Sequence, residues 1–501
     1  MGVPGFLKWI KNTCRNCIQE NISTTKGILA QVLIDLNSFI HQAAAEIYGY
    51  DGHEGVKNPS HKLIIERVID KVKHILDTYN AEEYFISIDG VPTLSKISQQ
   101  KKRRFNAIQI KDWNNIFISP YHPFMAKLYE KLYLEFDQVN YARRILNDDG
   151  EIISKKFSID RLGRYKKISE KDKEKLMNEF KKVIISSHYE SGEGEHKIMA
   201  NMKKSGKIAI FGTDADIVIL SLAKSNNDIY ISSKYGFIYK KKFSEYLASS
   251  GMINTDDFIL ITYLFGNDFI PRLEDFENIR TLTKAIEIYK NFMGIIYKDT
   301  PINELTTRKE INWVNLKRYF LELLKYSNYF YSSRTDADYL SSIYIKEGKP
   351  QFLKLVHMSI LDQKRRQIYY PYQGDHINII KEDMCTNWLI GLQWFNETYQ
   401  GKIYSDWYYH FNHPLMLEEI VDFMDHFLAK NCFKENIKII ENQAKKNEYR
   451  LSLLQHFIAI CPHKYLDLIK DVNLTSLEDY FPIEYKDEMM ATIPIIRIME
   501  I

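Results

Sequence analysis

Seven acidic residues stand at or beside the ends of apolar runs in this chain of 501 residues. They are Asp35 in QVLIDLN, Asp89 in YFISIDG, Glu193 and Glu195 in SGEGEH, Asp214 and Asp216 in IAIFGTDADIVIL, and Asp268 in YLFGNDF. A strand that ends in a carboxylate places it at the C-terminal edge of the sheet, where open α/β sheets bind ligands. Carboxylates that converge there repel one another unless cations neutralise them. The pattern predicts two Mg²⁺ or Mn²⁺ ions, about 3.5–4 Å apart, and phosphodiester hydrolysis.

A structural alternative exists for each of these acids, because a single aspartate after a strand is more often a helix N-cap or a turn residue. The pairs Asp214/Asp216 and Glu193/Glu195 fit this alternative less well. Residues two apart on an extended segment point the same way, so each pair presents two carboxylates to one side.

A basic cluster follows Asp89 in the segment GVPTLSKISQQKKRRF. Lys96, Gln100, Arg103 and Arg104 recur at helical spacing, and such a face beside a metal site could hold a terminal phosphate. In isolation, a solvated helix face or a localisation signal would explain the same cluster. His41, six residues after Asp35, could stack on a base if a helix follows the first strand.

Residues 1–275 alternate between strand-like and helical patterns, which predicts a mostly parallel sheet covered by helices. The strand-like runs are Gln31–Leu36, Tyr84–Ile88, Val183–Ser186, Ile208–Phe211 and Asp228–Ser232, and Lys62–Tyr79 has a helical pattern. Residues 276–344 read as a helical continuation. Residues 345–501 read as an aromatic-rich second region that packs on the core.

Composition limits the class of protein. A net charge of +3 means that nucleic-acid affinity would have to come from local patches. No apolar run reaches about 18 residues, so no membrane span is expected. Five cysteines are few and odd in number, which favours a reducing compartment and ordinary thiols at Cys14 and Cys17.

Several motifs together resemble the XRN-type 5′→3′ exoribonucleases, in order and approximate spacing. They are MGVPGF, IDLNSFIH, SIDGVPTLSKISQQKKRRF, SGEGEHKIM, GTDADIVILSL and FGNDFIPRL, followed by GLQWFNETYQG, DWYYHFNHP, ICPHKYLDLI and YFPIEYKDEMM. The resemblance covers nearly the whole chain. It implies a Rossmann-like core of the PIN and flap-endonuclease type, here as a minimal core without a C-terminal extension, of the kind a virus or a compact genome would encode.

The resemblance also implies roles for individual residues. The seven acids match the family's metal site, the four residues of the basic cluster match its 5′-monophosphate pocket, and His41 matches the ring that stacks on the 5′-terminal base. Trp394 is the first choice for the aromatic partner of His41, and Trp407 is the alternative. A departure occurs at Pro92–Leu94, where the family usually has Ala-Pro-Arg.

The expected activity is a Mg²⁺-dependent, processive 5′→3′ exoribonuclease that degrades 5′-monophosphorylated single-stranded RNA to mononucleotides. We expect a monomer without membrane association, in the host or viral cytoplasm or the nucleus, with decapping or other RNA-processing enzymes as partners. Two alternatives stay open. A structure-specific 5′-flap DNA endonuclease would share the acids, and an inactive RNA-binding scaffold would share the fold.

Overall fold

The computed structural model describes most of the chain. The described residues are 3–22, 28–106, 109–110, 112–136, 182–252, 254–276, 281–295, 303–326, 358, 361–363, 377–402, 404, 407–411, 414–429, 433–445 and 451–461. Most of the ICPHKYLDLI motif and all of YFPIEYKDEMM lie outside these residues.

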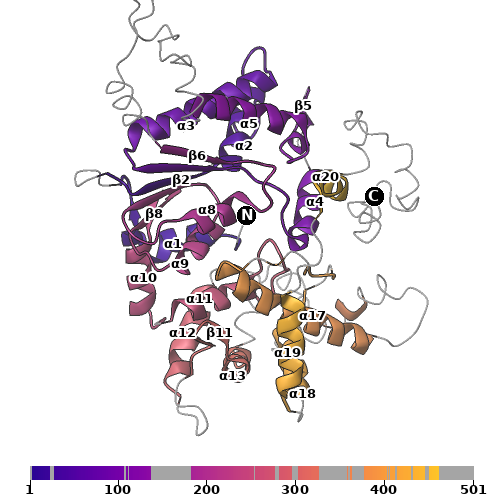
Figure 1. The fold of residues 1–501 in the computed structure, drawn as a ribbon. Coiled ribbons are helices and arrows are strands. Elements are labelled where there is room, and N and C mark those ends of the chain that lie inside the picture. Colours follow the sequence, from indigo (N-terminus) through magenta and orange to yellow (C-terminus); the bar gives the residue numbers. More distant parts are fainter. Residues whose placement is uncertain are drawn as a thin grey trace, which may run out of the picture.

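A sheet of seven strands forms the centre of the N-terminal part (Figure 1). Its order is β1 (Ile18–Gln19), β9 (Gly236–Tyr239), β8 (Ile229–Ser233), β7 (Ile208–Phe211), β2 (Gln31–Asp35), β3 (Glu83–Ser87) and β6 (Lys182–Ser186). The five strands from β8 to β6 pair in parallel, and β9 and β1 add an antiparallel edge. The predicted mostly parallel α/β sheet is thus confirmed. All five strand predictions fall on strands, with bounds that differ by at most one residue, whereas β1 and β9 were not predicted.

Helices cover both faces of this sheet, because successive side chains of each central strand point to opposite faces. Val32 and Ile34 of β2 pack with α2, α3 and α5, whereas Leu33 between them belongs to the cluster that contains α8–α11. Strands buried on both faces are typical of parallel sheets and read as continuous apolar runs. The helices of this part are α1 (Phe6–Thr13), α2 (Leu36–Tyr48), α3 (His61–Thr78), α4 (Ile97–Phe105), α5 (Pro123–Phe136), α8 (Gly194–Asn201), α9 (Asp216–Leu222), α10 (Lys240–Ser249) and α11 (Thr255–Thr262).

A second, helical part lies below the sheet in Figure 1 and shares its hydrophobic core. It contains α12 (Leu282–Met293), α13 (Trp313–Leu324), α17 (Ile377–Tyr399), α18 (Leu417–Ala429) and α19 (Phe433–Ala444). The described residues also contain two small hairpins, β4 (Gln109–Ile110) with β5 (Trp113–Asn114) and β10 (Thr306–Thr307) with β11 (Glu310–Ile311). Tyr263, which follows α11, packs against Trp388 and Phe395 of α17. This packing ties the aromatic-rich helix to the core.

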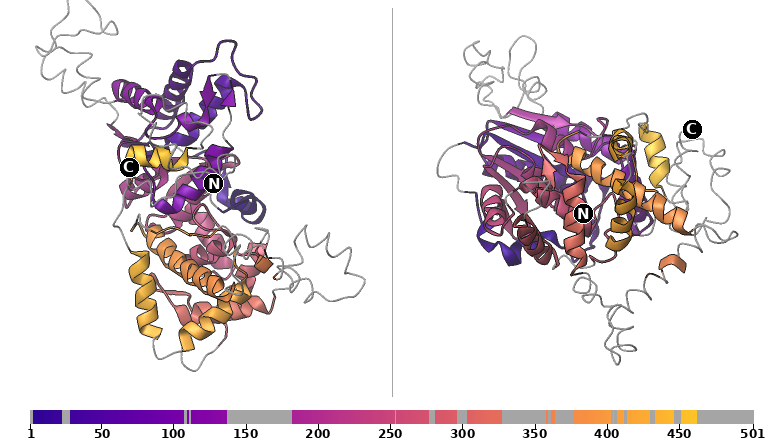
Figure 2. Two further views of the ribbon diagram at one scale, coloured as in Figure 1. Left: turned by 90° about the vertical axis from the view of Figure 1, so that its right-hand side faces the viewer. Right: turned by 90° about the horizontal axis from the view of Figure 1, so that it is seen from below.

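One further helix returns to the N-terminal part. Helix α20 (Leu453–Ile460) starts with a capping box formed by Ser452 and Gln455, and it lies beside α4 in both Figure 1 and Figure 2. Two segments separated by roughly 350 residues in sequence therefore meet next to the basic cluster.

The structure differs from the sequence-based expectation at Cys14 and Cys17. The structure joins Cys14 and Cys17 in a disulfide, with 5.5 Å between their Cα atoms, where the sequence predicted thiols. The 3-10 turn Arg15–Cys17 brings the two residues together directly after α1. Among the described helices, none has the length and apolar character needed to cross a membrane.

Candidate metal and phosphate site

Three of the predicted acids lie at one edge of the sheet. Asp35 is the last residue of β2, Asp89 lies two residues beyond β3, and Asp214 lies three residues beyond β7. These strands are parallel neighbours with β2 in the middle, so their C-terminal ends point to the same place. The strand order therefore brings together carboxylates that are up to 179 positions apart in sequence.

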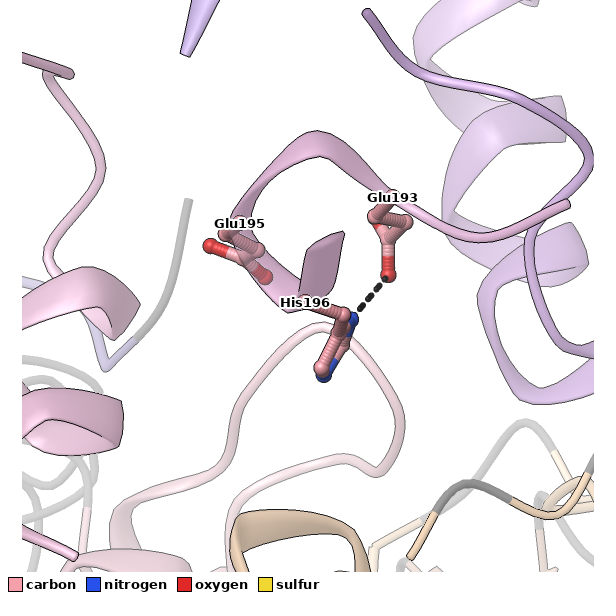
Figure 3. Close-up of side chains that lie close together, drawn as sticks. All are labelled: Glu193, Glu195 and His196. Atoms are coloured by element: carbon pink, nitrogen blue, oxygen red, sulfur yellow. Dashed lines mark ion pairs between the residues drawn. The ribbon is translucent and has the colours of Figure 1, made fainter. Parts of the chain in front are cut away.

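A second group of acids comes from the start of α8 (Figure 3). Glu193 is the N-cap residue of this helix, Glu195 lies in its first turn, and both side chains are buried. With the neighbouring His196 they form a group whose possible metal-ligating atoms all lie within 4.8 Å of one another. His196 Nδ1 is 3.8 Å from Glu193 Oε2, as Figure 3 shows.

Gly194 explains how the two groups of acids approach each other. Its backbone N–H donates a hydrogen bond of 2.6 Å to Asp89 Oδ1. A Cβ atom at this position would lie 2.8 Å from Asp35 Oδ1 and 3.1 Å from Asp89 Oδ1. Only glycine leaves room for both carboxylates at the helix start.

Backbone and side-chain hydrogen bonds fix the loops that carry these acids. Gly90 N–H donates to Gly192 O, and Gly192 N–H donates to Val91 O, which joins the loop after β3 to the loop before α8. Asn37 holds Asp89 from the other side, because its Nδ2 donates to Asp89 Oδ2 at 2.7 Å and its Oδ1 accepts from the Asp89 N–H. The position of Asp89 is therefore determined by three segments of the chain.

Burial and neighbouring negative charges raise the pKa values of four of the acids. Burial, together with the charges of Asp89 and Asp214, raises the pKa of Asp35 well above its usual value. Burial and the Glu193 charge raise the pKa of Asp89 to about 6. Burial and the charge of Asp216 likewise raise the pKa of Glu195.

Asp216 lies in the first turn of α9 and is almost completely buried. Burial and the Asp268 charge raise its pKa to about 7. Its Oδ1 atom and Asp35 Oδ1 have no hydrogen-bond partner among the described residues. Buried carboxylate oxygens that lack donors fit divalent cations, which prefer such oxygen ligands. The residues present therefore fit the predicted metal chemistry.

Lys96 and Asp268 connect the acids to the basic helix. Lys96 Nζ lies 2.6 Å from Asp268 Oδ2 and 2.8 Å from Glu193 Oε1, and its side chain is buried. Burial alone would raise the pKa of Asp268, but the positive charges of Lys96 and Arg103 lower it below its usual value. In this structure Lys96 thus contacts two of the acids directly.

One cavity of about 760 Å³ brings the predicted residues together. Six of the seven acids line it, namely Asp35, Asp89, Glu193, Glu195, Asp214 and Asp268, and so do Lys96, Gln100, Arg103, Arg104 and His41. Desolvation and the charges of Arg104 and Arg103 lower the pKa of His41 to about 4, so its ring is neutral near pH 7. Arg104 Nη2 donates to Ile118 O at 3.0 Å, which anchors one end of the basic cluster.

The two tryptophans that were candidates for base stacking lie elsewhere. Trp394 and Trp407 are buried, their ring centroids are 5.1 Å apart, and Trp394 also packs edge-on against Phe269. Trp394 Nε1 donates to Tyr404 O at 2.8 Å. The structure does not bring either ring into the cavity beside His41. A stacking role for either tryptophan therefore stays a prediction, and the buried packing of both rings argues against it.

Sequence reasoning missed several residues that support the site. Asn37 and Gly194 lie inside motifs that the sequence analysis quotes, yet neither was assigned a role. Lys197 was also missed: its Nζ donates to Ile88 O and Ser187 O, both at 2.8 Å, next to Asp89. The available signal was that Asn37 lies two residues after Asp35 and that Lys197 lies two residues after Glu195. The loop after β3, which both side chains bind, is distant from them in sequence.

Parts of this chain resemble known proteins. Residues 1–233 match the family model described as XRN 5'-3' exonuclease N-terminus. The chain is 22% identical over 390 residues to 5'-3' exoribonuclease 1 of Saccharomyces cerevisiae, which covers 65% of this chain and 23% of that protein. It is 20% identical over 439 residues to 5'-3' exoribonuclease 2 of Arabidopsis thaliana, covering 70% of this chain and 42% of that protein.

A viral relative is also similar. A protein of Acanthamoeba polyphaga mimivirus is 28% identical over 160 residues, which are 26% of this chain and 24% of that protein. The chain thus spans about a quarter of the length of the yeast relative. Residues 1–233 therefore resemble the XRN 5'-3' exonuclease N-terminus.

Proposed function

We propose that this chain is a divalent-metal-dependent 5′→3′ exoribonuclease that degrades 5′-monophosphorylated single-stranded RNA to 5′-mononucleotides. The observation that carries the proposal is the cavity that six of the acids line together with Lys96, Arg103 and Arg104. An exonuclease of this direction must hold a terminal phosphate and cleave the next phosphodiester. A basic pocket next to a metal-binding group of acids serves both needs.

The division of roles follows from the charges. Two bound Mg²⁺ or Mn²⁺ ions would activate water and stabilise the leaving oxygen. The seven acids, from Asp35 to Asp268, would hold these ions. Gln100, Arg103 and Arg104 would bind the terminal phosphate, because guanidinium groups contact phosphate oxygens in a bidentate manner. Lys96 would lie between the two, since its ammonium group already faces Glu193 and Asp268.

The neutral His41 ring on the cavity wall would stack on the first base. This contact would place the scissile phosphate over the acids, and the next base would take its place after each cleavage. RNA is the one partner that this chemistry requires. A cytoplasmic or nuclear location, a monomeric state and partner decapping enzymes remain part of the proposal.

A time course on end-labelled RNA tests the proposal. Substrates with a 5′-monophosphate, triphosphate, hydroxyl or cap are compared, with a 5′-flap DNA beside them and EDTA as a control. We expect rapid mononucleotide release only from the RNA with a 5′-monophosphate. Cleavage of the flap DNA in preference to RNA would favour the endonuclease alternative instead.

The matched variant is Asp214→Ala combined with Asp216→Ala. It should abolish cleavage while metal-independent RNA binding survives, because the basic pocket is unchanged. Retention of more than about a tenth of the wild-type rate would refute the assignment of these acids to metal binding.

A further inference from the structure

Helix α20 packs beside the basic helix α4 (Figures 1 and 2). Leu94 and Ile97, at the start of the basic segment, share a small hydrophobic cluster with Ile458 and Ile460 of α20, and all four side chains are buried. This cluster is separate from the two that cover the faces of the sheet. Helix α20 therefore contacts the segment that carries the phosphate pocket rather than only the general core.

A polar contact crosses this interface. His456 Nε2 lies 2.7 Å from Gln100 Oε1, and the two residues are 356 positions apart in sequence. The His456 side chain is completely buried, whereas Gln100 lines the cavity. Because the contact joins a buried group to a cavity group, it can transmit the position of α20 to the pocket wall.

The orientation of the Gln100 amide in the structure, with Oε1 toward the ring, sets the direction of this hydrogen bond. Burial and the nearby Arg104 charge lower the pKa of His456 to about 3, so the ring is neutral and carries one N–H. Gln100 Oε1 can only accept, and Nε2 must therefore be the donor. His456 Nδ1 is then the unprotonated nitrogen, and it has no hydrogen-bond partner among the described residues.

This hydrogen bond determines which end of the Gln100 amide is available to a ligand. With Oε1 bound to His456, the Nε2 amino group is the free end of the amide. An amino group donates to phosphate oxygens, whereas a carbonyl oxygen would repel them. The contact thus selects the orientation that suits an anion.

We propose that His456 is a positioning residue for the 5′-phosphate pocket, which holds the Gln100 amide with its amino group toward the terminal phosphate. The inference rests on the proposed function, since it assumes that the basic pocket binds a 5′-phosphate. It adds a specificity-determining residue from the far end of the chain, outside the family-matched residues 1–233.

The experiment measures end discrimination, which is the ratio of kcat/KM for 5′-monophosphorylated RNA to kcat/KM for 5′-hydroxyl RNA of the same sequence. The variants are His456→Phe, which keeps an aromatic ring without a donor, and His456→Gln, whose amide can reach the same acceptor. Gln100→Ala and the double variant with His456→Phe complete a cycle. His426→Phe is the matched control, because His426 is exposed on α18.

His456→Phe should lower the ratio about tenfold, the scale of one hydrogen bond to a charged group. His456→Gln should restore most of it, and His426→Phe should leave it unchanged. In the double variant the ratio should fall no further than in Gln100→Ala. Wild-type discrimination in His456→Phe, with discrimination lost in Gln100→Ala, would overturn the inference.

The choice of variants and substrates also covers two other outcomes, a His456→Phe variant that does not fold and a wild-type protein without end discrimination. If His456→Phe does not fold, His456→Asn replaces it, because its shorter amide cannot reach Gln100. Equal ratios for the Asn and Gln variants would then overturn the inference. If the wild-type protein itself degrades both substrates equally, the proposed 5′-phosphate pocket fails, and this result is read from the wild type alone.

Discussion

Substitution of one glycine should weaken metal binding without unfolding the protein. In Gly194→Ala, the new Cβ would lie 2.8 Å from Asp35 Oδ1 and 3.1 Å from Asp89 Oδ1. Ordinary contact begins at 3.4 Å, so the Asp35 carboxylate must move by roughly 0.6 Å. Metal ligands tolerate displacements of only about 0.2 Å. At least one carboxylate should therefore cease to bind metal.

The expected size of the effect is a 10- to 100-fold loss of apparent metal affinity, by analogy with other perturbed metal sites. Stability should change little, because alanine is favoured over glycine within a helix by up to about 1 kcal/mol, and this gain offsets part of the strain. Gly194 is the first residue of α8.

The assay titrates Mg²⁺ or Mn²⁺ against the rate of mononucleotide release from 5′-monophosphorylated RNA, with thermal melting of the same samples. Gly294→Ala is the matched control, since the nearest atom to its Cβ would be a backbone oxygen at 3.3 Å, after α12. High metal concentration should restore part of the Gly194→Ala rate. A wild-type rate with unchanged metal dependence in Gly194→Ala would refute the reasoning.

Three further predictions concern the pocket and the acids. Arg103→Ala or Arg104→Ala should reduce the preference for 5′-monophosphorylated over 5′-hydroxyl RNA by roughly 1.5–3 kcal/mol per lost contact, measured as a ratio of kcat/KM values. An unchanged ratio would contradict the pocket assignment. His41→Ala should slow degradation of a hairpin with a 5′ overhang more than that of an unstructured strand, because stacking of about 1–3 kcal/mol offsets the opening of base pairs. Equal losses on both substrates would reject a role for stacking in melting. Since folding raises the pKa of Asp89 to about 6 and of Asp216 to about 7, from 3.8, the metal-free protein loses stability as pH rises through about 4–7. Cations bind the ionised carboxylates, so the increase in Tm on adding Mg²⁺ should grow over this interval. Thermal melts with Mg²⁺ or EDTA at pH 5, 6, 7 and 8 measure this increase. An increase that is the same at every pH would contradict the prediction.

The sequence by itself determined the sheet and the side chains that its edge would carry. Short continuous apolar runs such as Val32–Ile34 and Ile208–Phe211 favour strands buried on both faces, and this signal is local in sequence. The positions of the acids that follow these strands are also set by the local sequence, because a residue that ends a strand must lie at the edge of the sheet. The short antiparallel strand β1 is two residues long, which is too short for any periodic signal.

Only the tertiary structure decided which residues face the cavity and what supports them. Trp394 and His41 are both aromatic candidates in sequence, but the packing of α17 buries the former while α2 places the latter on the cavity wall. The clash that requires glycine at position 194 depends on the approach of Asp35, and the Gln100–His456 contact depends on the return of α20. Such contacts join segments far apart in the chain, and their geometry is set by how helices pack on the sheet rather than by any local spacing.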